Sequence, residues 1–387
     1  MSKWQECRLG EVAEIQTGPF GSQLKNSQYV TGGTPVITVE HIDNFRIIDF
    51  DYPSVTYEDK KRLSKYLLNQ GDIIFTRVGS VDLSAYVQPH QQDWMFSSRM
   101  LRVRSDQRIN SRFLSYFFQQ NSFREYILSI AVGATMPSIN TEILKSVPIS
   151  YPSLPEQKAI SSVLSSLDDK IDLLHRQNKT LEAMAETLFR QWFVEEDSGF
   201  REGCLADVAI NVKEAIKASD LKSESKYIGL EHIDQRNIAL KHYGFGSEVS
   251  SNKYAFQRHD ILFGKLRPYF HKVCFAPFSG ICSTDILVIR PIKSELFAFC
   301  LFAFFQDEVV EYANLSSGGT RMPRTDWTTL KNYPIAIPDS YSIERFNNAV
   351  SSSLKKISSN LEQIRTLETL RDTLLPKLMS GEVRVTV

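Results

Sequence analysis

The sequence predicts an α+β protein built from two similar halves, each a mixed α/β globular domain followed by a long helix. Two observations support this prediction. Several stretches recur in the same order at a nearly constant spacing, and each half ends in a long heptad pattern of apolar residues. An internal repeat of this kind determines the whole architecture.

The repeat is visible as pairs of matching stretches. The phrase Glu-His-Ile-Asp stands at residues 40–43 and again at 231–234. Further along, GDIIFTR matches HDILFGK, SSRMLRVR matches STDILVIR, GATMPSINTEILKSVPI matches GTRMPRTDWTTLKNYPI, and LEAMAETL matches LETLRDTL. The shift between the copies is 188 residues for the first of these pairs and 186 for the others. The chain is therefore a tandem duplication with a pseudo-two-fold internal repeat.

The first part of each half is rich in β-branched and aromatic residues in short runs bounded by Gly, Pro, Asn and Asp, such as TPVITVEHI and RMLRVRS. Such runs are typical of strands and turns. The stretch FLSYFFQQNSFREYIL predicts a helix among them. We therefore expect one globular domain over residues 1–152 and a second over residues 197–340.

The second part of each half predicts a long helix, over residues 153–196 and over residues 341–387 with a C-terminal tail. Apolar residues alternate by four and three, as in the a/d seam of a coiled coil. The first seam is Ile160, Leu164, Leu167, Ile171, Leu174, Asn178, Leu181, Ala185, Leu188 and Trp192, and Phe346, Val350, Leu354, Ile357, Leu361 and Ile364 begin the second.

The order domain, helix, domain, helix requires the second helix to return along the first, so we expect an antiparallel pair. The alternative is that each helix packs only on its own domain. That alternative leaves roughly forty residues of narrow apolar stripe unexplained in each half.

The composition is that of a globular protein, with 42% hydrophobic and 23% charged residues. No segment offers about 18 consecutive apolar residues, so no membrane span is predicted. The five cysteines are widely spaced without a Cys-x-x-Cys pair, which is typical of reduced thiols and predicts a cytoplasmic location. His259, His271, Cys274 and Cys282 match no usual zinc spacing, so no metal site is predicted.

The charge is balanced overall, with 45 basic and 45 acidic residues, but it is uneven locally. Residues 99–112 hold five arginines and one aspartate. Residues 258–272 hold four Lys or Arg and two His with one aspartate. Since phosphate binding depends on where charge lies, both segments are compatible with binding to nucleic acid.

Three stretches resemble the specificity subunits of type I restriction-modification systems: the domain end from Gly133 to Gln157, the helix LDDKIDLLHRQNKTLEAMAETLFRQWF and the closing LLPKLMSGEVRV. The resemblance extends over essentially the whole chain. It implies two target-recognition domains, each reading one half of a bipartite asymmetric site in double-stranded DNA, with the helices setting the gap. It also implies two adenine-N6 methyltransferase (M) subunits docked around the helices, and motor-nuclease (R) subunits for restriction. The second half departs from the pattern at IPDSYSIERF, which lacks the Pro-Glu-Gln of the first.

The repeat separates shared contacts from candidate base readers, because positions identical in both halves cannot distinguish two different half-sites. The shared Glu-His-Ile-Asp is interpreted as a strand end and turn held by side-chain hydrogen bonds. A shared contact to the DNA backbone through His41 and His232 is the alternative. Arg77 and Lys265 are both basic, which suits phosphate anchoring.

Arg99 and Asp285 occupy equivalent positions and differ, so they are candidate base readers. Arginine can bridge guanine O6 and N7, whereas a carboxylate can accept from cytosine N4. An ordinary substitution on the sheet surface is the alternative.

In the Gly-rich loop, both halves share Met-Pro, which suggests a fixed loop shape, and the residues around it differ. Thr135, Ser138 and Asn140 are candidate base contacts in the first half, and Arg321 and Arg324 in the second. Gln23, Lys25 and Arg267 are further candidates for DNA binding on loop position alone.

Two features of the helices stand out. Asn178 lies at an apolar seam position and Asn360 is its counterpart; if they meet, they fix the register of the pair. However, the best seam of the second helix passes through Leu361. Phe189, Trp192 and Phe193 form more aromatic surface than two helices require, so they either bind a partner subunit or pack on the second domain.

No motif for catalysis is present. The sequence lacks the Asn/Asp-Pro-Pro-Tyr/Phe motif of adenine methyltransferases and a Gly-x-x-x-x-Gly-Lys-Ser/Thr phosphate loop. We therefore predict no catalytic residue and no cofactor, with methylation and cleavage left to partner subunits. Two alternatives remain open: a self-sufficient DNA methyltransferase or nuclease, and a coiled-coil structural protein that does not bind DNA.

Overall fold

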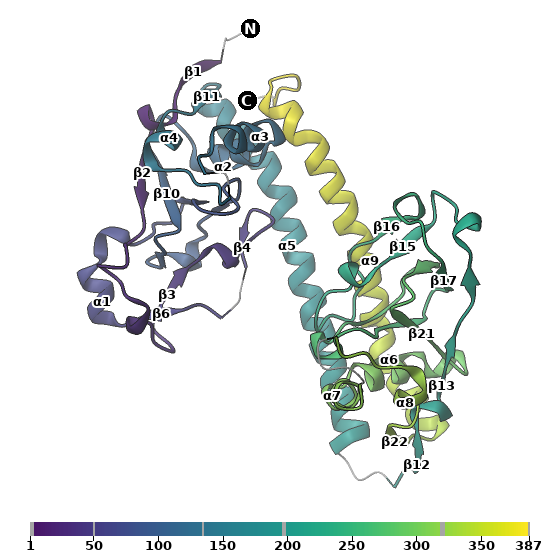
Figure 1. Ribbon diagram of the computed structural model, residues 1–387. Helices are drawn as coiled ribbons and strands as arrows, with labels where there is room; N and C mark the ends of the chain where they lie inside the picture. The colour runs from purple at the N-terminus through teal and green to yellow at the C-terminus, as the bar shows by residue number, and fades with distance from the viewer. Residues whose placement is uncertain (1–3, 49–50, 134, 196–198, 318–321, 386–387) are drawn as a thin grey trace. The chain divides into compact units, whose positions relative to one another are not determined.

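The computed structural model describes residues 4–48, 51–133, 135–195, 199–317 and 322–385. It divides into two compact units (Figure 1). Unit 1 comprises residues 1–170 and 367–387, and unit 2 comprises residues 171–366. There are two long helices, α5 (Leu154–Arg190) and α9 (Ser340–Met379). The first part of α5 and the last part of α9 belong to unit 1, and the rest of both helices belongs to unit 2.

Unit 1 contains a four-stranded antiparallel sheet in the order β2-β10-β7-β8 and a three-stranded sheet in the order β6-β3-β9. Strand β1 pairs with β11, and β4 pairs with β5. Its strands are β1 (Gln5–Arg8), β2 (Ala13–Thr17), β3 (Thr34–Ile37), β4 (Ile42–Asp43), β5 (Arg46–Ile47), β6 (Ser54–Val55), β7 (Ile73–Thr76), β8 (Ser84–Tyr86), β9 (Met95–Phe96), β10 (Met100–Ser105) and β11 (Pro148–Tyr151). Its shorter helices are α1 (Tyr57–Arg62), α2 (Ser111–Gln119), α3 (Asn121–Ile130) and α4 (Thr141–Lys145).

Unit 2 repeats this plan with a four-stranded antiparallel sheet, β13-β21-β18-β19, and a five-stranded sheet, β14-β17-β20-β15-β16. Its strands are β12 (Arg201–Cys204), β13 (Ala209–Val212), β14 (Ala215–Ile216), β15 (Lys226–Ile228), β16 (Gly244–Phe245), β17 (Lys253–Phe256), β18 (Ile261–Gly264), β19 (Val273–Phe275), β20 (Gly280–Cys282), β21 (Ile286–Pro291) and β22 (Pro334–Ile337). Its shorter helices are α6 (Phe297–Phe305), α7 (Asp307–Leu315) and α8 (Trp327–Leu330).

The duplication read from the sequence is confirmed in the contacts. In unit 1, the carboxylate of Asp72 accepts two hydrogen bonds of 2.7 Å from the guanidinium of Arg104. In unit 2, Asp260 and Arg290 form the same bidentate pair, also at 2.7 Å. Charge-assisted bidentate pairs are among the stronger hydrogen bonds in proteins. The same ion pair therefore stabilises the four-stranded sheet at the equivalent position in each unit.

Each central sheet has a core on both faces, because successive strand residues point to opposite sides. In β7, Ile73 and Phe75 join the cluster that contains α2 and α3, whereas Ile74 joins the cluster around β3 and β9. In β18, Ile261 and Phe263 face α6, and Leu262 faces the five-stranded sheet. The fully apolar runs IIF and ILF in the sequence follow from burial on both faces.

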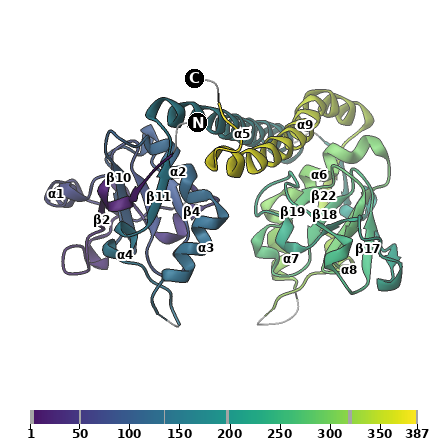
Figure 2. The ribbon, with the colours of Figure 1, turned by 90° about the horizontal axis from the view of Figure 1, so that it is seen from above.

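The helices α5 and α9 run antiparallel within each unit, as the sequence predicts. In unit 2, where they lie side by side (Figure 2), Asn178 faces Asn360 and Phe189 faces Phe346. In unit 1, Asp168 pairs with Arg371, and Glu156 of α5 pairs with Arg384, which follows α9. Residue numbers thus rise along α5 as they fall along α9.

The predicted seam is buried over most of its length. Ile160, Leu164, Ile171, Leu174 and Ala185 of α5 are all buried. At the end of α5 the buried positions change: Phe189 and Phe193 are buried in place of Leu188 and Trp192. Within the described residues, no helix has the length and apolarity to cross a bilayer.

Candidate nucleic-acid interface

In unit 1, Arg77 directly follows β7 and joins three segments through its main chain. Its N–H donates to the carbonyl of Arg99 at 2.9 Å, and its carbonyl accepts from the N–H of Ile139 at 3.0 Å. The end of β7, the segment before β10 and the loop that precedes α4 are thereby held together.

Unit 2 forms the same junction at equivalent positions. The N–H of Lys265 donates to the carbonyl of Asp285 at 2.8 Å, and its carbonyl accepts from Thr325 at 3.0 Å. Because these bonds use main-chain atoms only, the same frame can carry different side chains in the two units.

The side chains of Arg77 and Lys265 brace this frame. Arg77 Nη1 donates to the carbonyl of Ser98 at 3.2 Å, and Lys265 Nζ donates to that of Thr284 at 2.6 Å. Burial lowers the pKa of Lys265, and nearby Asp285 opposes this effect. Both cations are half-buried, so phosphate anchoring stays a prediction beside this structural role.

The proline of the shared Met-Pro accepts an equivalent main-chain hydrogen bond in both units. The N–H of Gly79 donates to Pro137 at 2.9 Å, and that of Arg267 donates to Pro323 at 2.8 Å. Arg267 takes the left-handed conformation with φ 50°, where the first half has a glycine with φ 85°. A non-glycine residue in the left-handed conformation is uncommon. That Arg267 adopts it indicates that the second half needs the same turn that Gly79 forms in the first half.

Asp285 and Arg324 form an ion pair between two segments of unit 2. The guanidinium of Arg324 remains 56% exposed, whereas the carboxylate of Asp285 is 32% exposed. Their counterparts in unit 1 are Arg99, which is exposed, and Ser138, which is half-buried. Each unit therefore presents an arginine at this edge, but from opposite segments. Since Asp285 is engaged by Arg324, its predicted reading of cytosine is less favoured than a role in orienting the arginine.

Asn140 has a structural role that the sequence analysis missed. Its Oδ1 accepts from the N–H of Ile143 at 2.8 Å and caps α4. Asp326, at the equivalent position, accepts from Thr329 at 3.0 Å and caps α8. Asn and Asp are both favoured N-caps. An Asn or Asp directly before a short helical stretch was the signal for this role.

Three of the remaining candidates, Gln23, Lys25 and Thr135, belong to unit 1. Gln23 Oε1 accepts from the hydroxyl of Tyr66 at 2.5 Å, so its side chain is engaged within the domain. Lys25 and Thr135 are exposed. Arg321 lies outside the described residues.

The aromatic residues at the end of α5 and in the π-helical turn that follows it (Gln191–Glu195) correct the expectation of a partner surface. Phe189 and Phe193 are only 3% and 7% exposed and belong to the core of unit 2. Their ring centroids lie 5.5 and 5.2 Å from that of Phe299. Trp192 is half-buried beneath the guanidinium of Arg345, 4.4 Å from the ring centroid. The alternative interpretation, packing on the second domain, describes these residues.

The repeated Glu-His-Ile-Asp forms a turn in both units. The Nδ1 of His41 accepts from the N–H of Thr38 at 2.9 Å, and the Nδ1 of His232 accepts from Gly229 at the same distance. The interpretation as a turn held by side-chain hydrogen bonds is confirmed.

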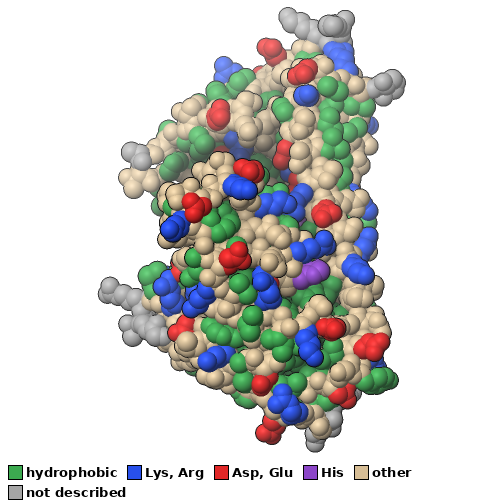
Figure 3. Space-filling view, turned by 90° about the vertical axis from the view of Figure 1, so that its right-hand side faces the viewer, with side chains coloured by type: hydrophobic (Ala, Val, Ile, Leu, Met, Phe, Trp, Pro, Cys, Tyr) green, Lys and Arg blue, Asp and Glu red, His purple; other side chains and the backbone are tan. Residues whose placement is uncertain are grey.

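The face displayed in Figure 3 has basic and acidic side chains interspersed, in keeping with the net charge of zero. Over the described part of the chain, no three His, Cys, Asp or Glu side chains gather closely enough to hold a metal ion.

The sequence matches a known family over most of its length. The profile of the type I restriction modification DNA specificity domain matches twice, over residues 1–183 and 197–370. The chain is 25% identical to the type I restriction enzyme MjaIX specificity subunit of Methanocaldococcus jannaschii, covering 99% of this chain and 94% of that protein. It is 21% identical to the HindI specificity subunit of Haemophilus influenzae, covering 99% and 100%.

The fold is also similar to a solved structure. The crystal structure of the type I restriction-modification S subunit from M. genitalium superposes with a TM-score of 0.63 at 15% identity, covering 97% of this chain and 96% of that one. At this identity the likeness concerns the fold.

Proposed function

Because the chain belongs to the family of type I restriction-modification DNA specificity domains, we propose that it is the DNA sequence-recognition subunit of a type I restriction-modification complex. The observation that supports this most is the pair of equivalent junctions at Arg77 and Lys265. Each junction is built from main-chain bonds and presents different side chains on the same frame. That is the arrangement expected of two modules that read different sequences.

Each domain reads one half of a bipartite asymmetric site in double-stranded DNA. An arginine can contact guanine through two hydrogen bonds in the major groove. Arg99 in the first domain and Arg324 in the second are exposed at equivalent edges and suit this role. Their placement on opposite segments supports two different half-sites and hence an asymmetric full site.

The helices α5 and α9 set the gap between the half-sites. Helix α5 has 37 residues, so at about 1.5 Å per residue it is about 55 Å long. Half-sites on one face of B-DNA are separated by about 34–36 Å for each helical turn. A paired helix of this length is long enough to hold two reading modules at such a separation.

The subunit is not catalytic, and it acts in the cytoplasm. Two adenine-N6 methyltransferase subunits dock around its helices and methylate the site, and motor-nuclease subunits join them for restriction. The absence of methyltransferase and phosphate-loop motifs from the sequence is in keeping with this division of roles.

Co-expression with the methyltransferase subunit of the same system tests this function. Methylated adenines mapped by long-read sequencing are expected to fall in a split asymmetric motif with a gap of fixed length. Methylation by the isolated chain would instead favour a self-sufficient enzyme. Absence of DNA binding at low salt, even with the methyltransferase present, would favour a structural coiled-coil protein.

A further inference from the structure

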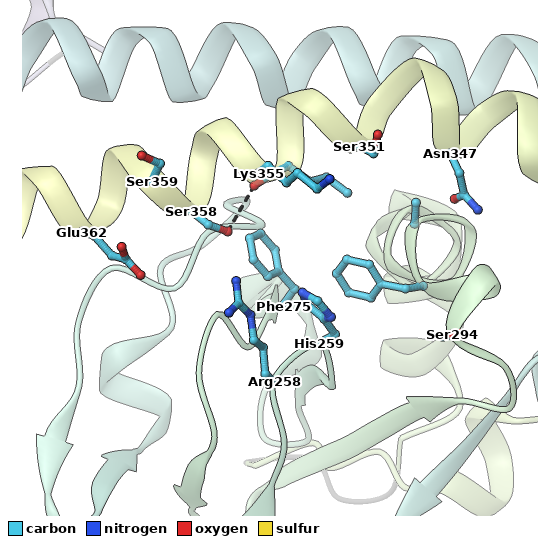
Figure 4. A pocket seen from close by; sticks show the side chains of 13 residues that line it. Arg258, His259, Phe275, Ser294, Asn347, Ser351, Lys355, Ser358, Ser359 and Glu362 are labelled. Atoms are coloured by element: carbon cyan, nitrogen blue, oxygen red, sulfur yellow. Dashed lines mark hydrogen bonds between the residues drawn. The ribbon is translucent and has the colours of Figure 1, made fainter.

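Unit 2 contains a pocket between α9 and the second domain (Figure 4). Its volume is about 510 Å³, which lies within the range of binding sites for ligands. Arg258, His259 and Phe275 point toward the helix, which contributes Ser351 and Lys355 to the opposite wall.

The floor of the pocket is aromatic. The ring centroids of Phe275 and Phe297 lie 6.0 Å apart, and His259 stacks on Phe297 at 4.7 Å. Partial burial, together with the adjacent guanidinium of Arg258, lowers the pKa of His259, so its ring is neutral near pH 7.

The rim of the pocket is mainly positive. Arg258 and Lys355 are both exposed there, with Glu362 as the acidic lining residue. An apolar floor beside two cations is suited to a group that is partly apolar and partly anionic.

The repeat supplies an internal comparison for this pocket. Strand pairing makes Tyr86 the counterpart of Phe275, because Ile73 pairs with Tyr86 as Ile261 pairs with Phe275. The shift of 186 residues makes Arg112 the counterpart of Ala298.

In unit 1, the equivalent place is closed by an intramolecular contact. The guanidinium of Arg112 lies 4.6 Å from the ring centroid of Tyr86. Its Nη2 is 3.3 Å from Oδ1 of Asp169 on α5. A cation held between an aromatic ring and a carboxylate thus joins the first domain to its helix.

The counterparts of these residues in the described part of unit 2 cannot form this closing contact, and the charge on the helix is opposite. Ala298 stands where unit 1 has the arginine, and Lys355 stands where unit 1 has Asp169. The aromatic ring is kept as Phe275. The place that an intramolecular cation fills in unit 1 is therefore open in unit 2, and its helix wall attracts an anion.

We propose that this pocket is a docking site for a protein segment that carries a carboxylate side chain next to an apolar one. The carboxylate pairs with Lys355 and Arg258, and the apolar side chain packs on Phe275 and Phe297. The segment belongs to a methyltransferase subunit, so this inference rests on the proposed function. The first domain closes the same place by itself, and the two halves therefore receive their partners differently.

The test measures binding of the purified methyltransferase subunit to the full chain by calorimetry. Lys355→Glu is expected to weaken binding about tenfold or more, because it places like charges in a desolvated contact. The matched control is Lys356→Glu, which makes the same change at the exposed neighbouring position outside the pocket. That variant is expected to stay within about twofold of wild type.

A second variant fills the pocket from within. The double change Ala298→Arg with Lys355→Asp introduces the residue types of unit 1, so that the new arginine can lie over the ring of Phe275. This variant is expected to raise Tm while also weakening binding. This excludes misfolding as the cause of weaker binding.

If both pocket variants bind like wild type, the docking site is wrong, whereas a split methylation motif would still support the proposed function. If wild type itself neither binds the methyltransferase nor directs methylation, the proposed function fails as well.

Discussion

Asn178 and Asn360 meet in the buried contact between α5 and α9 in unit 2, with Nδ2 of Asn360 2.7 Å from Oδ1 of Asn178. They are 6% and 0% exposed. Nδ2 of Asn360 also donates to Oε1 of Gln177 at 2.9 Å. The predicted seam ran through Leu361, yet both Asn360 and Leu361 are buried. A polar pair at this position fixes the register of the two helices.

Replacing either asparagine alone with leucine is expected to destabilise the chain by about 1–3 kcal/mol, because the hydrogen bond between the two amides is lost while one amide stays buried. The double change Asn178→Leu with Asn360→Leu is expected to recover most of that loss, since no buried amide remains and the exposed Gln177 can bond to water. Urea unfolding of the four proteins gives the coupling between the two sites. Additive losses would show that the two amides do not depend on each other.

The raised pKa of Glu182 is expected to make the stability of the chain depend on pH. Burial is the main cause that raises its pKa from 4.5 to about 7, and the N–H of Ile238, which donates to Oε1 at 2.9 Å, opposes the rise. A raised pKa means that the folded state favours the protonated carboxyl. The contribution of Glu182 to stability is therefore fully present below pH 4.5 and is lost as pH rises through about 7.

Glu182→Gln keeps an acceptor for Ile238 and removes the titration. Its free energy of unfolding is expected to exceed that of wild type at pH 8, with the difference shrinking toward pH 5. The measurement is chemical unfolding at several pH values, with the exposed Glu202→Gln as control. Parallel pH profiles of wild type and Glu182→Gln would contradict the assignment.

Arg99 and Arg324 predict changes in opposite halves of the DNA site. Arg99→Ala is expected to relax base preference in one half-site, and Arg324→Ala in the other. Discrimination at the affected position should fall about tenfold or more, since a bidentate base contact is worth about 1–3 kcal/mol. Methylation motifs mapped by long-read sequencing provide the measurement.

Asp285→Ala is expected to act on the same half-site as Arg324→Ala, because the carboxylate holds the guanidinium. Equal weakening on all sequences, with the motif intact, would assign these arginines to phosphate contacts instead.

Substitutions at Asn140 and Asp326 distinguish a role in helix capping from a role in base reading. If they are caps, Asn140→Ala and Asp326→Ala each lower stability by about 1 kcal/mol and leave the methylation motif unchanged. Asn140→Asp keeps a good cap and is expected to retain wild-type stability. A changed motif in Asn140→Asp with unaltered stability would restore the role in base reading.

Much of the fold follows from the sequence. The nearly constant shift, which is 186 residues over most of the length, identifies the repeat, and the four-three spacing of apolar residues identifies the helices that run antiparallel in each unit. The IIF and ILF runs identify strands, although only the structure shows that both of their faces are buried.

The site was predicted less completely, for physical reasons. Asp285 and Arg324 are 39 residues apart, and nothing in their local sequence shows that they pair. Phe189 and Phe193 are not on the seam predicted from the sequence, which runs through Leu188 and Trp192, yet both rings contact Phe346 of α9 and Phe299 of the second domain. Which aromatic residues are buried there depends on tertiary packing. Asn140, in contrast, had a local capping signal that favoured structure over base reading.

The junctions at Arg77 and Lys265 have a consequence for evolution. The same main-chain bonds form in both halves, although the neighbouring residues are Arg99 and Ser138 in the first half and Asp285 and Arg324 in the second. If these edges read DNA, as proposed, mutations there are expected to alter the preferred DNA sequence without repacking the interior. A lineage that must often change which DNA it protects gains new specificities from a scaffold that tolerates such exchanges.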